Sequence, residues 1–185
     1  MDELLEIISG CIKEKSQSQE KLFNRFSNKM FGVCRYYAKD YTEAEDILHE
    51  GFMKVFKNIK KFKGTGSFEG WMRKVFVNTA LERFRKKSFM YPVEDIYEYA
   101  NDINADEITS NIAANDIIQL IRELTPKYRM VFNLYAIEGY THKEIAKKMG
   151  ISEGTSKSNL SRARGILQNK VKKHFYVKGE NSEIA

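Results

Sequence analysis

The chain has 185 residues, of which 42% are hydrophobic and 30% charged, and its formal net charge is +6. This composition is typical of a soluble protein of one domain or two small ones, and no apolar run approaches the roughly 18 residues of a membrane-spanning helix. Cys11 and Cys34 stand in no metal-ligand spacing, so the sequence predicts reduced thiols, no metal and no cofactor. The acidic first three residues are unlike a basic secretory signal, which indicates a cytoplasmic protein.

The charge falls into blocks along the chain. Residues 54–90 carry 11 basic and 2 acidic side chains, and residues 116–178 carry 13 and 5. Residues 91–115, between them, carry 6 acidic side chains and no Lys or Arg. Phosphate binding is the simplest use of two basic blocks, so nucleic acid is the expected partner of both.

Helical periodicity dominates the first half of the chain. Residues 1–18 are a polar start with one or two helical turns, and residues 19–40 and 43–61 carry apolar stripes at helical spacing. Thr42 is expected to cap the helix over residues 43–61, with Glu45 as its capping-box partner.

The helix over residues 43–61 leaves Asp46, His49, Glu50 and Met53 off its buried stripe. Its first half is acidic and its second half basic, which complements the helix dipole and is a full structural explanation. The functional alternative is a docking surface for a protein partner, and spacing alone does not decide between the two.

Residues 62–70 contain three glycines but lack the Gly-Lys-Ser/Thr ending of a P-loop, which excludes nucleotide hydrolysis by that motif. The helix that follows, over residues 71–90, interleaves aromatic and basic side chains, a pattern that suits single-stranded nucleic acid. For Phe68, Trp71 and Phe76, packing in a core is an equally good interpretation.

Residues 91–115 show little apolar periodicity, and Tyr91-Pro92 ends the preceding helix. We expect an acidic flexible linker here. The predicted fold is therefore all-α: two small helical domains, residues 1–90 and 116–178, joined by this linker and followed by a frayed tail over residues 179–185.

The second domain contains a predicted helix-turn-helix over residues 141–164. Thr141 and Glu144 have the spacing of a capping box, Gly150 supplies the left-handed residue that ends a helix, and Ser152 caps the next one. A second helix with a basic outward face lies in the major groove of duplex DNA. The side chains expected on that face are Lys157, Ser158, Asn159, Ser161, Arg162 and Arg164.

These motifs, in this order, resemble bacterial RNA polymerase sigma factors of the extracytoplasmic-function (ECF) group over about residues 20–175. The resemblance rests on residues 44–52, 68–72 and 77–80 in the first half and on residues 124–126, 137–146 and 154–164 in the second. It implies a non-enzymatic specificity subunit whose partners are core RNA polymerase, through the clamp helices of its largest subunit, and promoter DNA. An anti-sigma factor is left open as a third partner, and no membrane span is expected.

The resemblance also assigns residues to each contact. Polymerase binding falls on Asp46, His49, Glu50, Phe52 and Met53. Contacts to the −10 element, with a flipped base beside the loop over residues 63–69, fall on Lys63, Ser67, Phe68, Arg73, Lys74, Asn78, Arg83 and Arg85. Contacts to the −35 element fall on Thr141, Lys143, Ser152, Thr155, Lys157, Ser158, Asn159, Ser161, Arg162 and Arg164.

Three residues depart from the family's pattern. His49 stands where the family usually has Gln, Ser156 where an apolar residue is buried, and Asn159 where Arg is common. Asn prefers adenine edges to guanine, so no −35 sequence is carried over.

Two other classes of function compete with the sigma factor. An autonomous helix-turn-helix regulator would bind duplex DNA as a dimer, but residues 1–90 show neither a heptad repeat nor a sensor pattern. An enzyme acting on nucleic acid would need clustered ligands or bases, whereas His49, His142 and His174 are far apart in the sequence.

Overall fold

The computed structural model describes residues 3–90 and 114–180, and within these ranges every regular element is helical. The chain divides into two compact units, unit 1 over residues 1–86 and unit 2 over residues 87–185. The acidic linker predicted over residues 91–115 lies almost wholly outside the described residues. Among the helices that are described, none is both long and apolar enough to cross a membrane.

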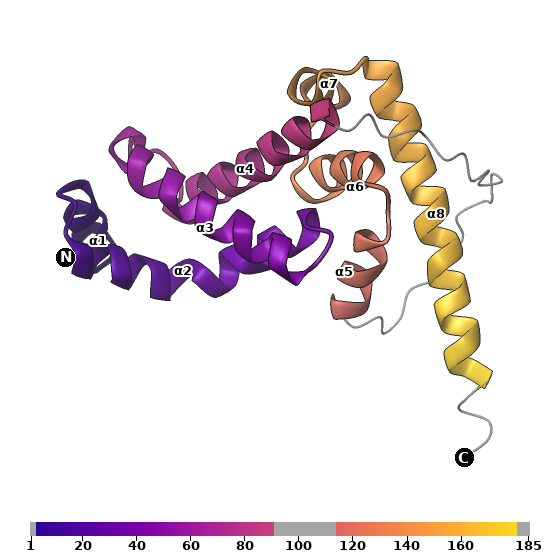
Figure 1. Ribbon diagram of the computed structural model, residues 1–185, viewed down its shortest axis with the longest axis horizontal. Helices are drawn as coiled ribbons and strands as arrows, with labels where there is room; N and C mark the ends of the chain where they lie inside the picture. Colours follow the sequence, from indigo (N-terminus) through magenta and orange to yellow (C-terminus); the bar gives the residue numbers. More distant parts are fainter. Residues whose placement is uncertain (1–2, 91–113, 181–185) are drawn as a thin grey trace. The chain divides into compact units, whose positions relative to one another are not determined.

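Unit 1 holds four helices and one short turn of 3-10 helix (Figure 1). They are α1 (Glu3–Ile12), α2 (Ser16–Tyr37), α3 (Tyr41–Asn58), η1 (Ile59–Lys61) and α4 (Phe68–Met90), the last of which continues beyond the unit's boundary. The prediction of one or two helical turns at the start was too short, because α1 is a helix of 10 residues. Ile7, Ile8 and Cys11 are buried, and this apolar face holds α1 against its neighbours.

The start of α3 differs from the predicted one. Asp40, not Thr42, is the N-cap, and its carboxylate accepts a hydrogen bond of 2.8 Å from the backbone N–H of Glu43. The Glu43 carboxylate accepts in turn from the backbone N–H of Lys39, at 2.7 Å. Asp is at least as good an N-cap as Thr, and the two carboxylates together satisfy one backbone N–H in the first turn of α3 and one just before the helix.

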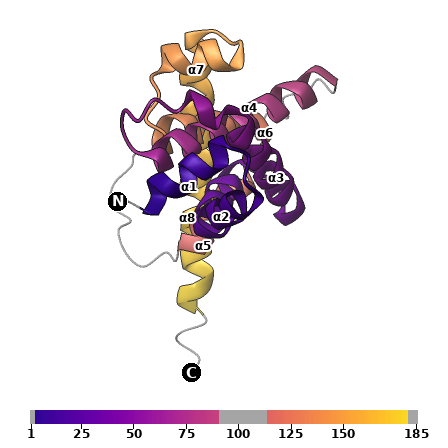
Figure 2. The same cartoon turned by 90° about the vertical axis from the view of Figure 1, so that its left-hand side faces the viewer.

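The core of unit 1 is built on packed aromatic rings. α2 and α3 lie side by side (Figure 1, Figure 2), and Phe52 of α3 is in contact with Phe23 of α2 and Phe76 of α4, at ring-centroid distances of 4.7 and 5.3 Å. Gly51 lets α3 and α4 approach at this point, because a Cβ atom there would overlap the Phe76 ring. The absence of a side chain at residue 51 thus sets the spacing of the two helices.

Unit 2 contains α5 (Ala114–Arg122), α6 (Pro126–Phe132), the π turn η2 (Asn133–Ile137), α7 (His142–Met149) and α8 (Glu153–Glu180). Figure 2 shows α7 beside the start of α8. α6 packs on α8. Tyr128 of α6, Ala163 of α8 and Leu124 of the turn before α6 are buried in this contact, and the partly buried Phe132, Ile166 and Leu167 extend it.

The predicted turn chemistry of the helix-turn-helix is confirmed. Thr141 and Glu144 form both bonds of a capping box at the start of α7, and Gly150 ends this helix with φ +70°. Ser152 Oγ then accepts a 2.9 Å hydrogen bond from the backbone N–H of Thr155, so it caps α8.

Candidate nucleic-acid interface

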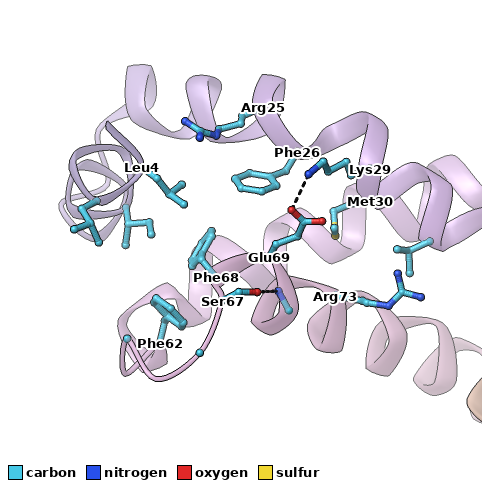
Figure 3. A pocket seen from close by; sticks show the side chains of 16 residues that line it. Leu4, Arg25, Phe26, Lys29, Met30, Phe62, Ser67, Phe68, Glu69 and Arg73 are labelled. Atoms are coloured by element: carbon cyan, nitrogen blue, oxygen red, sulfur yellow. Dashed lines mark hydrogen bonds and ion pairs between the residues drawn. The ribbon is translucent and has the colours of Figure 1, made fainter. Parts of the chain in front are cut away.

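A pocket of about 840 Å³ lies in unit 1 beside the loop that leads into α4 (Figure 3). Its apolar lining comes from Leu4, Leu5 and Ile8 of α1, Phe26, Met30 and Val33 of α2, and Phe62 and Phe68 beside the loop. Figure 3 shows the rings of Phe26, Phe62 and Phe68 around this space. A cavity walled by aromatic rings suits a flat, apolar-faced ligand.

Phe68 is part of the wall and not a free stacking platform. Only 4% of its surface is exposed, and its ring contacts Phe26, Phe62 and Trp71 at centroid distances of 6.0, 5.0 and 5.5 Å. The ring packs in the core and also lines the pocket, so its contact with the −10 element stays a prediction. Of the other two aromatics, Phe76 is buried and Trp71 half-buried.

The first turn of α4 is fixed by Ser67. Its Oγ accepts a 2.9 Å hydrogen bond from the backbone N–H of Gly70. Ser67 lines the pocket, so this predicted DNA-contact residue also has a structural role as a helix cap. Arg73, one turn further along, also lines the pocket.

An exposed basic face continues along α4. Lys74, Asn78 and Arg85 are exposed and recur at intervals of four and seven residues, which places them along one side of the helix. Lys63 is exposed on the loop. These four predicted DNA-contact residues are therefore accessible to a nucleic-acid backbone.

Arg83 is turned to α3, in contrast to its predicted place among the DNA contacts. Its guanidinium donates to the carboxylates of Asp46 and Glu50 at 2.9 and 3.2 Å. Lys54 joins the same network, at 2.9 Å from Glu50 and 2.7 Å from Glu82. Burial opposes ionisation of Glu50, but the hydrogen bonds from Lys54 and Arg83 outweigh it and hold the pKa of that carboxyl below its ordinary value.

The predicted polymerase-docking residues divide into two groups. Met53 is 71% exposed and His49 is exposed, so both are accessible on α3. Asp46 and Glu50 are held by Arg83. Phe52 was wrongly placed among the contacts: it is 3% exposed and packs inside unit 1, because its position on α3 coincides with the buried stripe.

The outward face of α8 carries most of the predicted −35 contacts. Thr155, Lys157, Ser158, Ser161, Arg162 and Arg164 are exposed, as are Thr141, Lys143 and Ser152 before them. Lys157 forms a 3.1 Å ion pair with Glu153 one turn earlier, and Ser158 Oγ donates to the backbone carbonyl of Thr155. The Arg164 guanidinium lies 5.5 Å from the ring centroid of Tyr135.

Asn159 was wrongly placed on the outward face of α8. It is 3% exposed, because it falls next to Ser156, Leu160 and Ala163 on the side of the helix that packs inside unit 2. Its side-chain Nδ2 is buried without a hydrogen-bond partner. The amide is therefore not accessible on the outward face, and the departure at residue 159 is a difference in packing.

Ser156 is buried, as the family pattern at its position predicts, and its hydroxyl is satisfied. Its Oγ lies 2.9 Å from Nδ1 of His142, and the His142 ring stacks on Tyr135 at a centroid distance of 4.7 Å. Sequence reasoning missed this contact because the two residues are 14 positions apart and on different helices. The only signal was the polar residue at an inward position.

Comparisons with known proteins match both halves of the chain. The Sigma-70 region 2 model matches residues 22–89, and the Sigma-70, region 4 model matches residues 114–167. The chain is 28% identical over 182 residues to the ECF RNA polymerase sigma factor SigW of Bacillus subtilis, covering 90% of this chain and 97% of that one. It is 26% identical over 179 residues to the ECF RNA polymerase sigma-E factor of Haemophilus influenzae, covering 88% of this chain and 94% of that one.

A solved structure shows the same fold. It is the sigma factor RpoE of Bartonella quintana, crystallised with the anti-sigma factor NepR, with a TM-score of 0.51 and 19% sequence identity. The match covers 83% of this chain and 96% of that one.

Proposed function

The chain belongs to the sigma-70 family of RNA polymerase sigma factors, in the ECF group, and directs transcription initiation; from this premise we propose how its two units divide that work. Unit 1 docks on core polymerase and traps the opened −10 element. Unit 2 reads the −35 element as duplex. The chain itself performs no chemical step, because selection and opening of a promoter need binding energy alone.

The pocket beside the 62–67 loop carries the proposal for unit 1. Opening a duplex costs about 1.4 kcal/mol per base-pair step, so an opening protein has to bind the bases that it unpairs. Stacking of a base on an aromatic ring contributes about 1–3 kcal/mol. The pocket presents apolar and aromatic walls, and Lys63, Lys74 and Arg85 lie on the loop and helix that border it, where they attract the strand.

The exposed start of α8 supports the proposal for unit 2. Lys157, Ser161 and Arg162 are exposed there, and the cap at Ser152 orients the first turn of the helix. A helix of this width and polarity enters the major groove, where Arg can bind guanine, and Lys and Ser can bind phosphate. We expect Arg162 to be the main base-reading residue and Lys157 to bind phosphate.

The α3 surface around Met53 supports polymerase docking. An exposed methionine is an adaptable apolar contact, and the carboxylates of Asp46 and Glu50 lie one to two turns before it on the same helix. We propose that this surface binds the clamp helices of the largest polymerase subunit. An anti-sigma factor as a further partner stays a prediction.

Reconstitution with core polymerase tests the proposal. Core polymerase with the chain is expected to start transcription at a defined position on a subset of promoter fragments, and core alone is not. The Arg162→Ala variant should weaken −35 binding by about 1–3 kcal/mol, measured by footprinting of the holoenzyme. If the free chain instead bound duplex DNA tightly at physiological salt and gave core no promoter selectivity, the proposal would be wrong and an autonomous regulator right.

A further inference from the structure

Two ion pairs stand at the rim of the pocket in unit 1. The Lys29 ammonium of α2 lies 2.8 Å from the Glu69 carboxylate in the first turn of α4, and Figure 3 shows this bond beside the pocket. The Arg25 guanidinium of α2 lies 3.1 Å from the Glu3 carboxylate of α1. Arg25, Lys29 and Glu69 all line the pocket.

Both ion pairs are exposed to solvent, so another anion can readily replace the carboxylate in each of them. The exposed fractions of the side chains are 62% and 46% for Lys29 and Glu69, and 43% and 77% for Arg25 and Glu3. Exposed pairs of this kind contribute little to stability. A phosphate oxygen accepts the same hydrogen bonds from Lys and Arg as a carboxylate oxygen does, so it can take the carboxylate's place.

Entry of an unpaired base into the pocket brings such phosphates to the rim. The base is joined to its neighbours by phosphodiesters on both sides, and these stay outside the apolar walls because they are charged. Three cations line the pocket: Arg73 of α4, which belongs to the basic block of residues 54–90, and Arg25 and Lys29 of α2, which lie outside that block.

We propose that Arg25 and Lys29 bind the phosphates that flank the inserted base, and that Glu3 and Glu69 occupy these cations until the strand arrives. The inference rests on the proposed function of the pocket. Exchange of a carboxylate for a phosphate is nearly neutral in free energy by itself. Only a strand that also buries a base gains enough binding free energy to displace the two carboxylates. The carboxylates therefore favour opened DNA over other polyanions.

The exchange makes a specific prediction about salt. A protein cation that neutralises a single-strand phosphate normally steepens the dependence of log K on log salt by about 0.7. In the wild-type chain the displaced Glu69 carboxylate stays beside the strand and offsets the charge of Lys29, so the pair adds little to the slope. The Glu69→Gln variant has no carboxylate to displace, so its slope should be steeper by about 0.7.

The experiment uses holoenzyme assembled from core polymerase and the full chain. Its affinity is measured over a salt series for a promoter fragment in which the −10 non-template strand is unpaired. Glu69→Gln should bind roughly two- to five-fold more tightly at low salt, as expected for release from one exposed ion pair. Lys29→Gln should bind more weakly by a similar factor with an unchanged slope, and Lys29→Arg should restore binding.

Glu14→Gln is the matched control. Glu14 lies between α1 and α2, forms an exposed ion pair with Lys60 at 3.7 Å, and changes the net charge equally on substitution, but it does not line the pocket. Its affinity and slope should match those of the wild type. If Glu69→Gln behaved as Glu14→Gln does, or weakened binding, the inference would be overturned while the proposed function stood. If wild-type holoenzyme failed to prefer the unpaired fragment, both would fail.

Discussion

Ser156 is a polar residue in the interior of the helix-turn-helix, and one hydrogen bond to His142 satisfies it. The two helices of the motif are joined there by a directional contact in addition to apolar packing. His142 also stacks on Tyr135, so η2, α7 and α8 meet at this group of side chains.

We predict that Ser156→Ala destabilises unit 2 by about 0.5–1.5 kcal/mol, the net contribution of a neutral hydrogen bond. The loss stays moderate because His142 is only half-buried and can turn to water. Urea unfolding followed by far-UV circular dichroism measures it. Ser158→Ala, at an exposed position two residues on, should change stability by less than about 0.5 kcal/mol. Equal effects at the two positions would remove the special role of Ser156.

Gly51 is the residue on which the spacing of α3 and α4 depends. We predict that Gly51→Ala destabilises unit 1 by about 1–3 kcal/mol, because the new methyl group overlaps the Phe76 ring and overpacking outweighs the gain in helix propensity. Gly32→Ala is the control: nothing lies within 4 Å of the added atom, so α2 should be stabilised by up to about 1 kcal/mol. Trp71, the single tryptophan, reports unfolding of unit 1 by fluorescence. Stabilisation by both substitutions would show that the helices can separate freely.

At the scale of elements, α3 and α4 are joined by an ionic network as well as by the aromatic core. Arg83 bridges two carboxylates that lie one turn apart on α3 and would otherwise repel each other. We predict that Arg83→Gln destabilises unit 1 by about 1 kcal/mol, measured by Trp71 fluorescence in urea. It should also weaken core polymerase binding, because Asp46 and Glu50 lose their common position. A variant that bound DNA less well but docked normally would return Arg83 to the DNA contacts.

The same network predicts a pH dependence. The pKa of Glu50 is lower in the folded chain than its ordinary value of 4.5, so the unfolded state binds its proton first as the pH falls. The stabilisation is therefore complete above that ordinary value and is lost as the pH falls through the lower, folded pKa. Urea unfolding of unit 1 followed by Trp71 fluorescence between about pH 6 and pH 3 should show this loss. The Glu50→Gln variant should show less of it, and an identical pH profile in that variant would contradict the assignment.

At the scale of the whole molecule, we propose that unit 1 carries the surface that docks on core polymerase. Among the described residues of unit 1, Met53 is the most exposed large apolar side chain, at 71%, and Ile117 of unit 2 is an exposed apolar side chain at 42%. We predict that Met53→Ala weakens core polymerase binding roughly five- to thirty-fold, or about 1–2 kcal/mol, as loss of an apolar anchor does. Ile117→Ala should leave binding within two-fold in the same competition assay. A normal binding curve for Met53→Ala would remove this surface from the interface.

Local chemistry explains how much of the structure could be read from residues alone. The all-α class, the acidic segment that separates two basic blocks, and the Thr141, Gly150 and Ser152 turn chemistry follow from periodicity and from side chains that bond to their own backbone a few positions away. Such interactions are complete within one turn of chain, so the sequence determined them. Local sequence does not distinguish Asp40 from Thr42 as the N-cap of α3, because both residues are good caps and the packing of α3 decides between them.

Only the tertiary structure decided which face of each helix is buried and which side chains pack against it. It turned Arg83 to α3, placed Phe52 and Asn159 inside, paired Ser156 with His142, and closed the walls of the pocket with side chains of α1. These outcomes depend on residues that lie up to 69 positions apart in the pocket lining, from Leu4 to Arg73. A helical repeat predicts that a side chain lies on a given face of its helix. The neighbour that packs against this face depends on how the helices pack, and this packing depends on all the helices together.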